Sequence, residues 1–150
     1  MANVKRVRIY TDGACRGNPG PGGWAAVLIF GPHHKEIAGG EVSTTNNRME
    51  LRAAIEALRA LTEPAEVDLF TDSAYLKRGI SEWLPRWKRD GWRRRRGRQL
   101  LPVANEDLWR QLEQLAQVHR VHFHWLAGHA GHPENELADR LARAAIPQSG

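Results

Sequence analysis

Two short segments of the sequence share a pattern in which an apolar run leads into an aspartate. The segments are RIYTDGA, which contains Asp12, and DLFTDSA, which contains Asp72. Because side chains alternate between the two faces of a strand, Asp12 shares a face with Tyr10 and Asp72 shares a face with Phe70. An unpaired carboxylate is costly to bury at such a position, so both acids need a common explanation.

Two further acids favour a metal site as that explanation. Glu50 lies in the first turn of a predicted helix between the two segments, and Asp139 lies beside the apolar stripe of the last predicted helix. Carboxylates at close range repel by roughly 4 kcal/mol per pair at an effective dielectric near 20, so they need a cation or shared protons. Oxygen ligands without cysteine favour Mg²⁺ or Mn²⁺ over zinc.

The elements that must position these acids form an α/β pattern. Apolar periodicity predicts strands at residues 4–11, 24–30, 35–43, 67–71 and 121–126, and helices at residues 48–61, 106–118 and 136–145. Short connections predict an antiparallel meander for the first three strands. The helix at 48–61 makes strands 4–11 and 67–71 parallel neighbours in a five-stranded mixed sheet. Asp12 and Asp72 then lie at one carboxyl edge, where open α/β sheets bind ligands.

Local signals refine these boundaries. Asn47 with Glu50 three residues later predicts an N-cap for the helix at 48–61. The Gly/Pro cluster at 13–23 predicts a rigid hairpin loop. A phosphate-binding loop is disfavoured, because Pro19 and Pro21 lack N–H donors and because a strand follows where such a loop would open a helix. A further helix is predicted to start at Ser73, break near 85 and merge into a basic segment that contains a turn at 90–91.

That basic segment, residues 83–98, carries most of the positive charge. It contains eight Lys or Arg residues against one Asp, while the whole chain has a net charge of +5. Trp83, Trp87 and Trp92 are interleaved with these charges, a combination that suits phosphates and the faces of sugars or bases. A solvated basic helix face is the alternative. Acids beside a basic, Trp-bearing surface indicate metal-assisted cleavage of phosphodiesters.

Length and composition limit the class of protein. The 150 residues, 41% hydrophobic and 26% charged, suit one α/β domain spanning residues 1–150, with a basic Trp-rich protrusion at about 83–98 and a frayed tail after 146. The longest apolar stretch, residues 24–30, is too short to cross a membrane. The single cysteine, Cys15, agrees with a reducing compartment. We therefore expect a soluble, cytoplasmic protein, with a monomer favoured.

The histidines between residues 119 and 132 do not have zinc-ligand spacing, and no cysteine accompanies them. A single loop histidine that carries a proton is the better interpretation, because the unperturbed pKa of histidine is close to neutral. Spacing alone does not choose between His129 and His132.

Four motifs in order resemble the bacterial ribonuclease HI family, also called type 1 ribonuclease H. They are TDGA followed by GNPGPGGW at 11–24, TTNNRMEL at 44–51, FTDS at 70–73, and GHAGHPENE at 128–136 followed by Asp139. The resemblance is collinear from about Val7 to Ala145 and includes the basic segment and the NEDLW sequence at 105–109. It implies a ribonuclease H-like fold with helices flanking the mixed sheet, and hydrolysis of the RNA strand of RNA–DNA hybrids, leaving 3′-hydroxyl and 5′-phosphate ends.

The resemblance also implies roles for individual residues. The metal-binding carboxylates are Asp12, Glu50, Asp72 and Asp139, with two Mg²⁺ ions engaged when substrate is bound and Mn²⁺ able to substitute. His129 is the catalytic proton carrier that helps the product leave, and His132 organises its loop. The implied substrate contacts are Cys15, Asn18, Asn46 and Asn47 in the minor groove on the RNA side, Thr45 and Asn105 on a DNA phosphate, and Trp83 and Trp87 along the DNA strand.

The sequence departs from the family pattern at Ala74 and Arg78, where relatives often carry Gln, and this concerns a minor-groove contact rather than the chemistry. Two other functions are alternatives. A non-catalytic hybrid-binding module gains nothing from four clustered carboxylates. Another metal nuclease on the same scaffold, such as a 3′–5′ exonuclease or a recombinase domain, requires activity on DNA, whereas Asn46 and Asn47 resemble the hybrid-specific branch.

Overall fold

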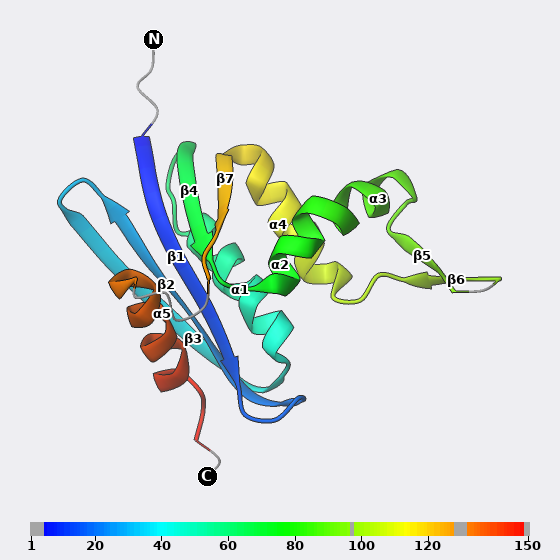
Figure 1. The fold of residues 1–150 in the computed structure, drawn as a ribbon, viewed down its shortest axis with the longest axis horizontal. Coiled ribbons are helices and arrows are strands. Elements are labelled where there is room, and N and C mark those ends of the chain that lie inside the picture. Colours follow the sequence, from blue (N-terminus) through cyan, green and yellow to red (C-terminus); the bar gives the residue numbers. More distant parts are fainter. Residues whose placement is uncertain (1–4, 97, 128–131, 149–150) are drawn as a thin grey trace.

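A five-stranded mixed sheet organises the computed structural model, which describes residues 5–96, 98–127 and 132–148 (Figure 1). Its strands are β1 (Lys5–Cys15), β2 (Gly20–Phe30), β3 (His33–Thr44), β4 (Ala65–Thr71) and β7 (Arg120–Trp125), in the order β3-β2-β1-β4-β7. β1, β2 and β3 are antiparallel neighbours, whereas β4 pairs with β1 and β7 pairs with β4 in parallel. The predicted meander followed by parallel strands is confirmed.

Helices cover both faces of this sheet. They are α1 (Asn46–Arg59), α2 (Ala74–Arg78), the π-helical segment η1 (Gly79–Trp83), α3 (Leu84–Arg89), α4 (Glu106–Val118) and α5 (Pro133–Ala144). Ile9 of β1 packs with residues of α1 and α4, whereas its neighbour Tyr10 packs with Ala138 of α5. Because adjacent strand residues face opposite ways, α1 and α5 lie on opposite faces (Figure 1). None of the helices in the described ranges is both long and apolar enough to span a membrane.

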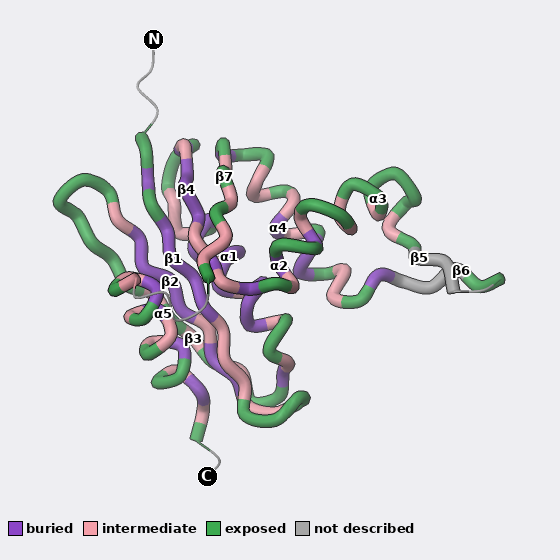
Figure 2. Tube along the Cα trace, in the orientation of Figure 1, coloured by how far each residue is buried: buried purple, intermediate pink, exposed green. Residues whose placement is uncertain are grey.

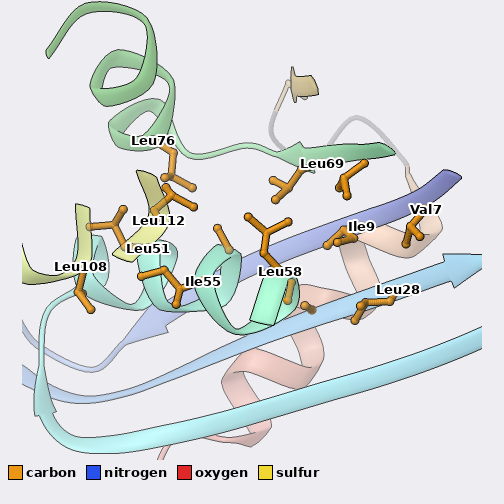
Figure 3. Packing of buried hydrophobic residues seen from close by; sticks show 14 of the residues in the cluster. Val7, Ile9, Leu28, Leu51, Ile55, Leu58, Leu69, Leu76, Leu108 and Leu112 are labelled. Atoms are coloured by element: carbon orange, nitrogen blue, oxygen red, sulfur yellow. The ribbon is translucent and has the colours of Figure 1, made fainter. Parts of the chain in front are cut away.

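The main hydrophobic core lies between α1 and the sheet (Figure 3). Leu51, Ile55 and Leu58 follow helical spacing on α1 and are fully buried, together with Ile9 and Leu69 of the strands beneath. Burial of each such side chain stabilises the fold by about 1.5–3 kcal/mol, which anchors the helix. The buried residues concentrate along the central strands and α1 (Figure 2). The helix that carries Glu50 is therefore held firmly against β1.

The register of the two central parallel strands aligns the two aspartates. β1 and β4 pair up to Tyr10 opposite Phe70. Asp12 and Asp72 each lie two residues beyond this pair, so both lie at the carboxyl end of the β1–β4 pairing and on the same face. The predicted adjacency of these two segments is confirmed.

The predicted N-cap of α1 is wrong by two residues. The helix begins at Asn46, and its N-cap is Thr45, whose hydroxyl oxygen accepts a hydrogen bond from the N–H of Arg48 (3.2 Å). Residues 44–47 are all types that cap helices, so the sequence alone did not separate them. Glu50 does not complete a capping box; its carboxylate faces β1 instead.

The sequence predicts a helix that starts at Ser73, breaks near residue 85, merges into the basic segment and is followed by a turn at 90–91, but it does not predict the hairpin after that turn. α2, η1 and α3 do run from Ala74 to Arg89, and a turn follows in which Gly91 has a positive φ of 69°. The chain then forms a two-stranded antiparallel hairpin of β5 (Arg93–Arg96) and β6 (Gln99–Pro102), which extends away from the central sheet with α3 (Figure 1). A run of four arginines has no apolar alternation, so it carried no strand signal.

Other boundaries also moved. β1 and β2 extend through most of the Gly/Pro cluster, which leaves residues 16–19 as the connection, so the predicted hairpin loop is shorter than expected. α5 begins at Pro133 rather than at Glu136, because proline at the first helical position has a backbone angle already suited to a helix.

His119 predicts a pH dependence of stability. This residue is buried, and its Nδ1 accepts a hydrogen bond from the N–H of Ala65 (3.1 Å), while the ring also bonds the backbone of Leu58. Burial lowers the pKa of the His119 imidazole below its usual value of 6.5. Its stabilising effect is therefore present above pH 6.5 and is lost as the pH falls through the lower folded-state value.

We expect the stability difference between wild type and His119→Gln, measured by urea unfolding, to shrink between pH 7.5 and pH 5. A difference that stays constant over this range would contradict the assignment of a lowered pKa to His119.

Candidate active site

Three carboxylates meet at the carboxyl edge of β1 and β4. One oxygen from each of Asp12, Glu50 and Asp72 lies within 4.8 Å of the others. Asp12 comes from β1, Asp72 follows β4 directly, and Glu50 comes from the first turns of α1. Asp12 and Glu50 are buried, whereas Asp72 is more exposed. The structure thus brings together three of the four acids singled out in the sequence.

Gly13 allows α1 to approach β1 closely enough to bring Glu50 into this cluster. A Cβ at Gly13 would lie 2.6 Å from the backbone nitrogen of Glu50, so only glycine fits without displacement of the helix. The N–H of Gly13 donates to Oδ1 of Asp12 (2.9 Å) and approaches Oε1 of Glu50 (3.3 Å). One backbone donor therefore faces two carboxylates, which leaves most of their negative charge without compensation.

The pKa values of the buried acids reflect this crowding. Burial, followed by the negative charge of Asp72 and a hydrogen bond with Asp139, raises the pKa of Asp12 from 3.8 to about 7. Burial, followed by the charges of Asp12 and Asp72, also raises the pKa of Glu50 well above its usual value. Without a cation the cluster retains protons near neutral pH, because like charges at this distance cannot all be ionised cheaply.

Asp139 lies outside this three-residue cluster, on α5, which covers the face of the sheet opposite α1. Its interaction with Asp12 is one of the causes that raise the pKa of Asp12. Gly23 of β2 permits the close approach of this helix, since a Cβ there would lie 2.1 Å from the carbonyl oxygen of Ala142. Oδ1 of Asp139 also accepts a hydrogen bond from Nε of Arg143 (3.1 Å). Arg143 was not among the predicted site residues, although its spacing of four residues from Asp139 on a helix is typical of such a pair.

The donor set fits a hard divalent cation. All the ligand atoms of the three-residue cluster are carboxylate oxygens, as Mg²⁺ and Mn²⁺ prefer. Oε2 of Glu50 is buried and has no hydrogen-bond partner among the described residues. A buried, unpartnered carboxylate oxygen is costly unless a proton or a cation satisfies it. The residues present therefore fit a metal site.

A hollow beside the acids contains two of the residues expected to bind substrate. Its volume is about 420 Å³, and Cys15, Asn46 and Asp139 are among the residues that line it. Asn18 contributes from the connection between β1 and β2, where its Oδ1 accepts a hydrogen bond from the N–H of Asn46 (3.3 Å). Asn47 is exposed at the start of α1. We call Cys15, Asn18, Asn46 and Asn47 the rim: Cys15 and Asn46 line the hollow together with Asp139, and Asn18 contacts Asn46.

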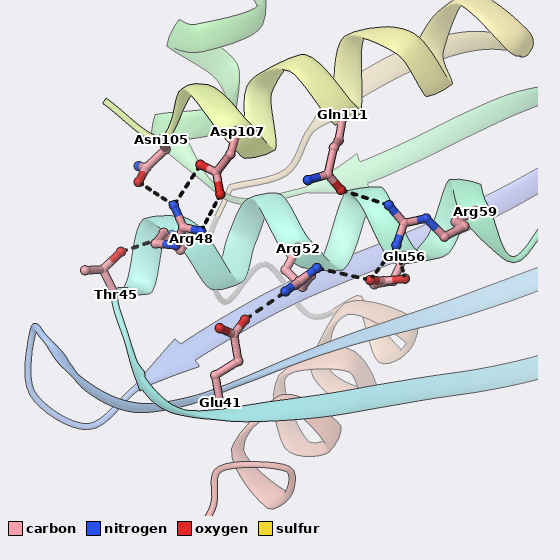
Figure 4. A network of polar contacts seen from close by, with 9 residues as sticks. All are labelled: Glu41, Thr45, Arg48, Arg52, Glu56, Arg59, Asn105, Asp107 and Gln111. Carbon is pink, nitrogen blue, oxygen red and sulfur yellow. Dashed lines mark hydrogen bonds and ion pairs between the residues drawn. The ribbon is translucent and has the colours of Figure 1, made fainter. Parts of the chain in front are cut away.

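Thr45 and Asn105, the residues expected to hold a phosphate, both contact Arg48 (Figure 4). The backbone N–H of Arg48 bonds the Thr45 hydroxyl, and its guanidinium donates to Oδ1 of Asn105 (3.2 Å). Asn105 in turn donates to the hydroxyl of Tyr75 (2.9 Å). Sequence reasoning missed Arg48 and Tyr75, because contacts between residues far apart in the chain leave no local pattern.

Trp83 and Trp87 belong to one aromatic cluster. Their ring centroids lie 5.8 Å apart, and Tyr75 contacts the ring of Trp83 at 5.6 Å. Arg78 stacks over Trp83 at 5.0 Å, so this departure from the family pattern adds a cation to the cluster. Trp87 also packs against the buried ring of Trp109 (5.7 Å), which ties the basic segment to α4.

His129, the expected proton carrier, lies outside the described residues. His132 is described; it is partly buried at the N-cap position of α5 and makes no side-chain capping bond.

The comparisons with known proteins agree with this architecture. The family model described as RNase H matches residues 4–147. The chain is 60% identical over 143 residues to a ribonuclease H of Chelativorans sp. (strain BNC1), covering 95% of this chain and 86% of that protein. It is also 60% identical over 143 residues to a ribonuclease H of Rhizobium etli, covering 95% and 93%.

A solved structure gives the same result. The crystal structure of LC9-RNase H1, a type 1 RNase H with the type 2 active-site motif, matches 97% of this chain and 74% of that chain, with a TM-score of 0.85 and 33% identity. A family model that covers nearly the whole chain, together with relatives of this identity, shows the family. The chain belongs to the ribonuclease H family of nucleases.

Proposed function

We propose that this ribonuclease H hydrolyses the RNA strand of RNA–DNA hybrids by a two-metal-ion mechanism. The observation that carries the proposal is the cluster of Asp12, Glu50 and Asp72, whose oxygens lie within 4.8 Å of one another in a chain of this family. Water adds to the phosphorus, the bond from phosphorus to the 3′-oxygen breaks, and a proton passes to that oxygen. The products carry 3′-hydroxyl and 5′-phosphate ends.

The four acids Asp12, Glu50, Asp72 and Asp139 are the proposed metal ligands. Two Mg²⁺ ions bound there, or Mn²⁺ in their place, would supply an activated water and stabilise the negative charge that develops on the phosphate. The anchoring of α1 and the close approach at Gly13 keep Glu50 in place for this task. We propose His129 as the residue that carries a proton for product release, because imidazole exchanges protons near neutral pH.

Substrate binding is proposed for the rim and the aromatic cluster. Discrimination of RNA from DNA requires contacts with the 2′-hydroxyl, and amide side chains provide both donors and acceptors for it. Asn18 and Asn46, which lie together beside the acids, have this chemistry. The proposed residues are Cys15, Asn18, Asn46 and Asn47 for the RNA strand, and Thr45, Asn105, Trp83 and Trp87 for the DNA strand.

We also propose that the chain acts as a monomeric single domain over residues 1–150 in the cytoplasm. The single cysteine, Cys15, suits a reducing compartment. Sedimentation velocity at micromolar concentration tests the monomer, since a dimer would sediment as a clearly faster species.

A labelled RNA strand annealed to DNA tests the function directly. The protein is incubated with this hybrid, with and without Mg²⁺, beside matched RNA–RNA and DNA–DNA duplexes. Metal-dependent internal cuts in the hybrid's RNA alone are expected. Binding without cutting would indicate a binding module, and cutting of DNA would indicate a different metal nuclease.

The arginines of β5 give a separate prediction about affinity. Replacing Arg93 to Arg96 with Gln should raise KM for the hybrid, flatten the dependence of log KM on log salt concentration, and leave kcat unchanged. Each cation that neutralises a phosphate releases counterions and steepens this dependence. Steady-state kinetics at several salt concentrations measure the slope, and an unchanged slope would show that the arginines do not touch phosphates.

A further inference from the structure

Thr45 and Asn105 are the N-cap residues of two different helices, α1 and α4, yet both are bonded to one residue, Arg48 (Figure 4). The backbone N–H of Arg48 donates to Oγ1 of Thr45 (3.2 Å). Its side-chain Nη1 donates to Oδ1 of Asn105 (3.2 Å). One residue of α1 thus occupies an acceptor oxygen of both side chains.

This arrangement leaves donors on both side chains. The Thr45 hydroxyl retains its own hydrogen after it has accepted a bond from Arg48. The Asn105 amide has two N–H groups, and one of them donates to the hydroxyl of Tyr75 (2.9 Å). The second N–H has no acceptor among the described residues. Because each oxygen already faces a donor of Arg48 while an O–H and an N–H stay free, the pair favours an anion.

Arg48 also decides which way the Asn105 amide points. The hydroxyl of Tyr75 can donate or accept, so it tolerates either end of the amide. The guanidinium has donors only, so only the amide oxygen can face it. A rotated amide would place its N–H groups against those of Arg48 and turn its oxygen toward the phosphate. The orientation that favours an anion therefore depends on the guanidinium of Arg48.

The Arg48 guanidinium is itself held in place, and the Asn105 side chain is not used as a helix cap. Asp107 accepts two hydrogen bonds from the Arg48 guanidinium (2.8 and 3.1 Å), so the guanidinium is fixed in a bidentate pair. Asn105 occupies the N-cap position of α4 but makes no capping bond with its side chain, and its φ is 59°. An asparagine at this position normally bonds the helix N-terminus. Here its amide is held by Arg48 and Tyr75 instead.

We propose that Arg48 is a positioning residue that orients the Asn105 amide so that Asn105 and Thr45 present donors to one backbone phosphate of the DNA strand. The inference rests on the proposed function and adds to it how that phosphate contact is built. Arg48 does not touch the phosphate; it acts through Asn105.

The variant Arg48→Lys tests this. Lysine keeps the positive charge and the backbone N–H to Thr45, but it lacks the planar group that holds Oδ1 of Asn105. We expect KM for the hybrid to rise about tenfold with kcat unchanged, the size associated with loss of one charge-assisted hydrogen bond. The matched control is Arg52→Lys, one turn along α1, where the arginine pairs with Glu41 and Glu56 (both 3.4 Å) and KM should stay at the wild-type value.

A double-mutant cycle separates positioning from a direct contact. If Arg48 acts through Asn105, the double variant Arg48→Lys with Asn105→Ala should have the KM of Asn105→Ala alone. KM values that multiply, or an unchanged KM in Arg48→Lys, would overturn the inference. Thermal unfolding verifies that each variant is folded at the assay temperature. Asp107→Asn, which loosens the guanidinium without altering α1, should raise KM in the same direction if Arg48→Lys fails to fold.

The substrate can be altered instead of the protein. Hybrids with one neutral methylphosphonate linkage at successive positions of the DNA strand should show one position that raises the wild-type KM, and that increase should be much smaller in Arg48→Lys. An equal increase in both proteins would overturn the inference, as would a sensitive position found only on the RNA strand. Failure of the wild type to cut any hybrid would instead refute the proposed function, so the two failures are distinguishable.

Discussion

Replacing Asp12 with asparagine is expected to reduce cleavage of the RNA strand at least about 1000-fold while the protein still binds the hybrid. Asparagine keeps the shape of the side chain but removes the charge that would hold a divalent cation next to Glu50 and Asp72. Metal-ion catalysis contributes several kcal/mol, and each 1.36 kcal/mol corresponds to a tenfold change in rate. Single-turnover cleavage in Mg²⁺ measures the rate, and fluorescence anisotropy with labelled hybrid measures binding.

Asp68→Asn is a matched control for this prediction. Asp68 is also a buried aspartate of the same sheet, but it pairs with Arg6 (3.0 Å) and His124 (2.9 Å) rather than with the cluster. Its variant should cut the hybrid at close to the wild-type rate. Retained cleavage in Asp12→Asn would remove Asp12 from the proposed metal site, and loss of hybrid binding would mean that the acid acts on the fold or on affinity.

Much of the fold follows from the sequence because its signals are local. The helical spacing of Leu51, Ile55 and Leu58 marks a helix that buries one face, and the run of short connections marks the meander. Once that helix links the first and fourth strands, the crossover rule makes them parallel and places Asp12 beside Asp72. The central prediction about the acids thus depended on topology, not on any single motif.

The sequence did not predict elements and contacts where local signals were absent or where several neighbouring residues gave the same signal. The arginine run of β5 has no alternating pattern, so the hairpin that follows the turn at 90–91 was not predicted. Four successive capping types at residues 44–47 left the start of α1 ambiguous, and the structure places it after Thr45, whose hydroxyl bonds the N–H of Arg48. The Arg48–Asn105 contact joins residues 57 apart in the chain, so no spacing rule detects it. The role of His129 stays a prediction, because this residue lies outside the described ranges.

The metal-free protein is expected to lose stability as the pH rises from about 4 to about 7. The pKa of Asp12 is 3.8 in the unfolded reference and about 7 in the folded protein, because of burial and the charge of Asp72. Between these values the folded state holds a proton that the unfolded state has released, so the free energy of unfolding decreases with increasing pH. A shift of this size corresponds to about 4 kcal/mol.

Mg²⁺ should reverse this loss, because a cation that binds only the folded state stabilises it. We expect the Tm to rise with Mg²⁺ at pH 8 and to change little at pH 5, where protons already neutralise the cluster. In Asp12→Asn both the pH slope and the Mg²⁺ effect should be strongly reduced. The lowered pKa of His119 has the opposite effect, because it makes the free energy of unfolding fall as the pH drops below 6.5. The difference in free energy of unfolding between wild type and Asp12→Asn at each pH therefore isolates the contribution of Asp12. If the two proteins keep parallel stability curves with and without Mg²⁺, Asp12 neither carries the raised pKa nor contributes to a cation site. Stability curves that converge at low pH would instead connect the raised pKa of Asp12 to the metal chemistry proposed for the cluster.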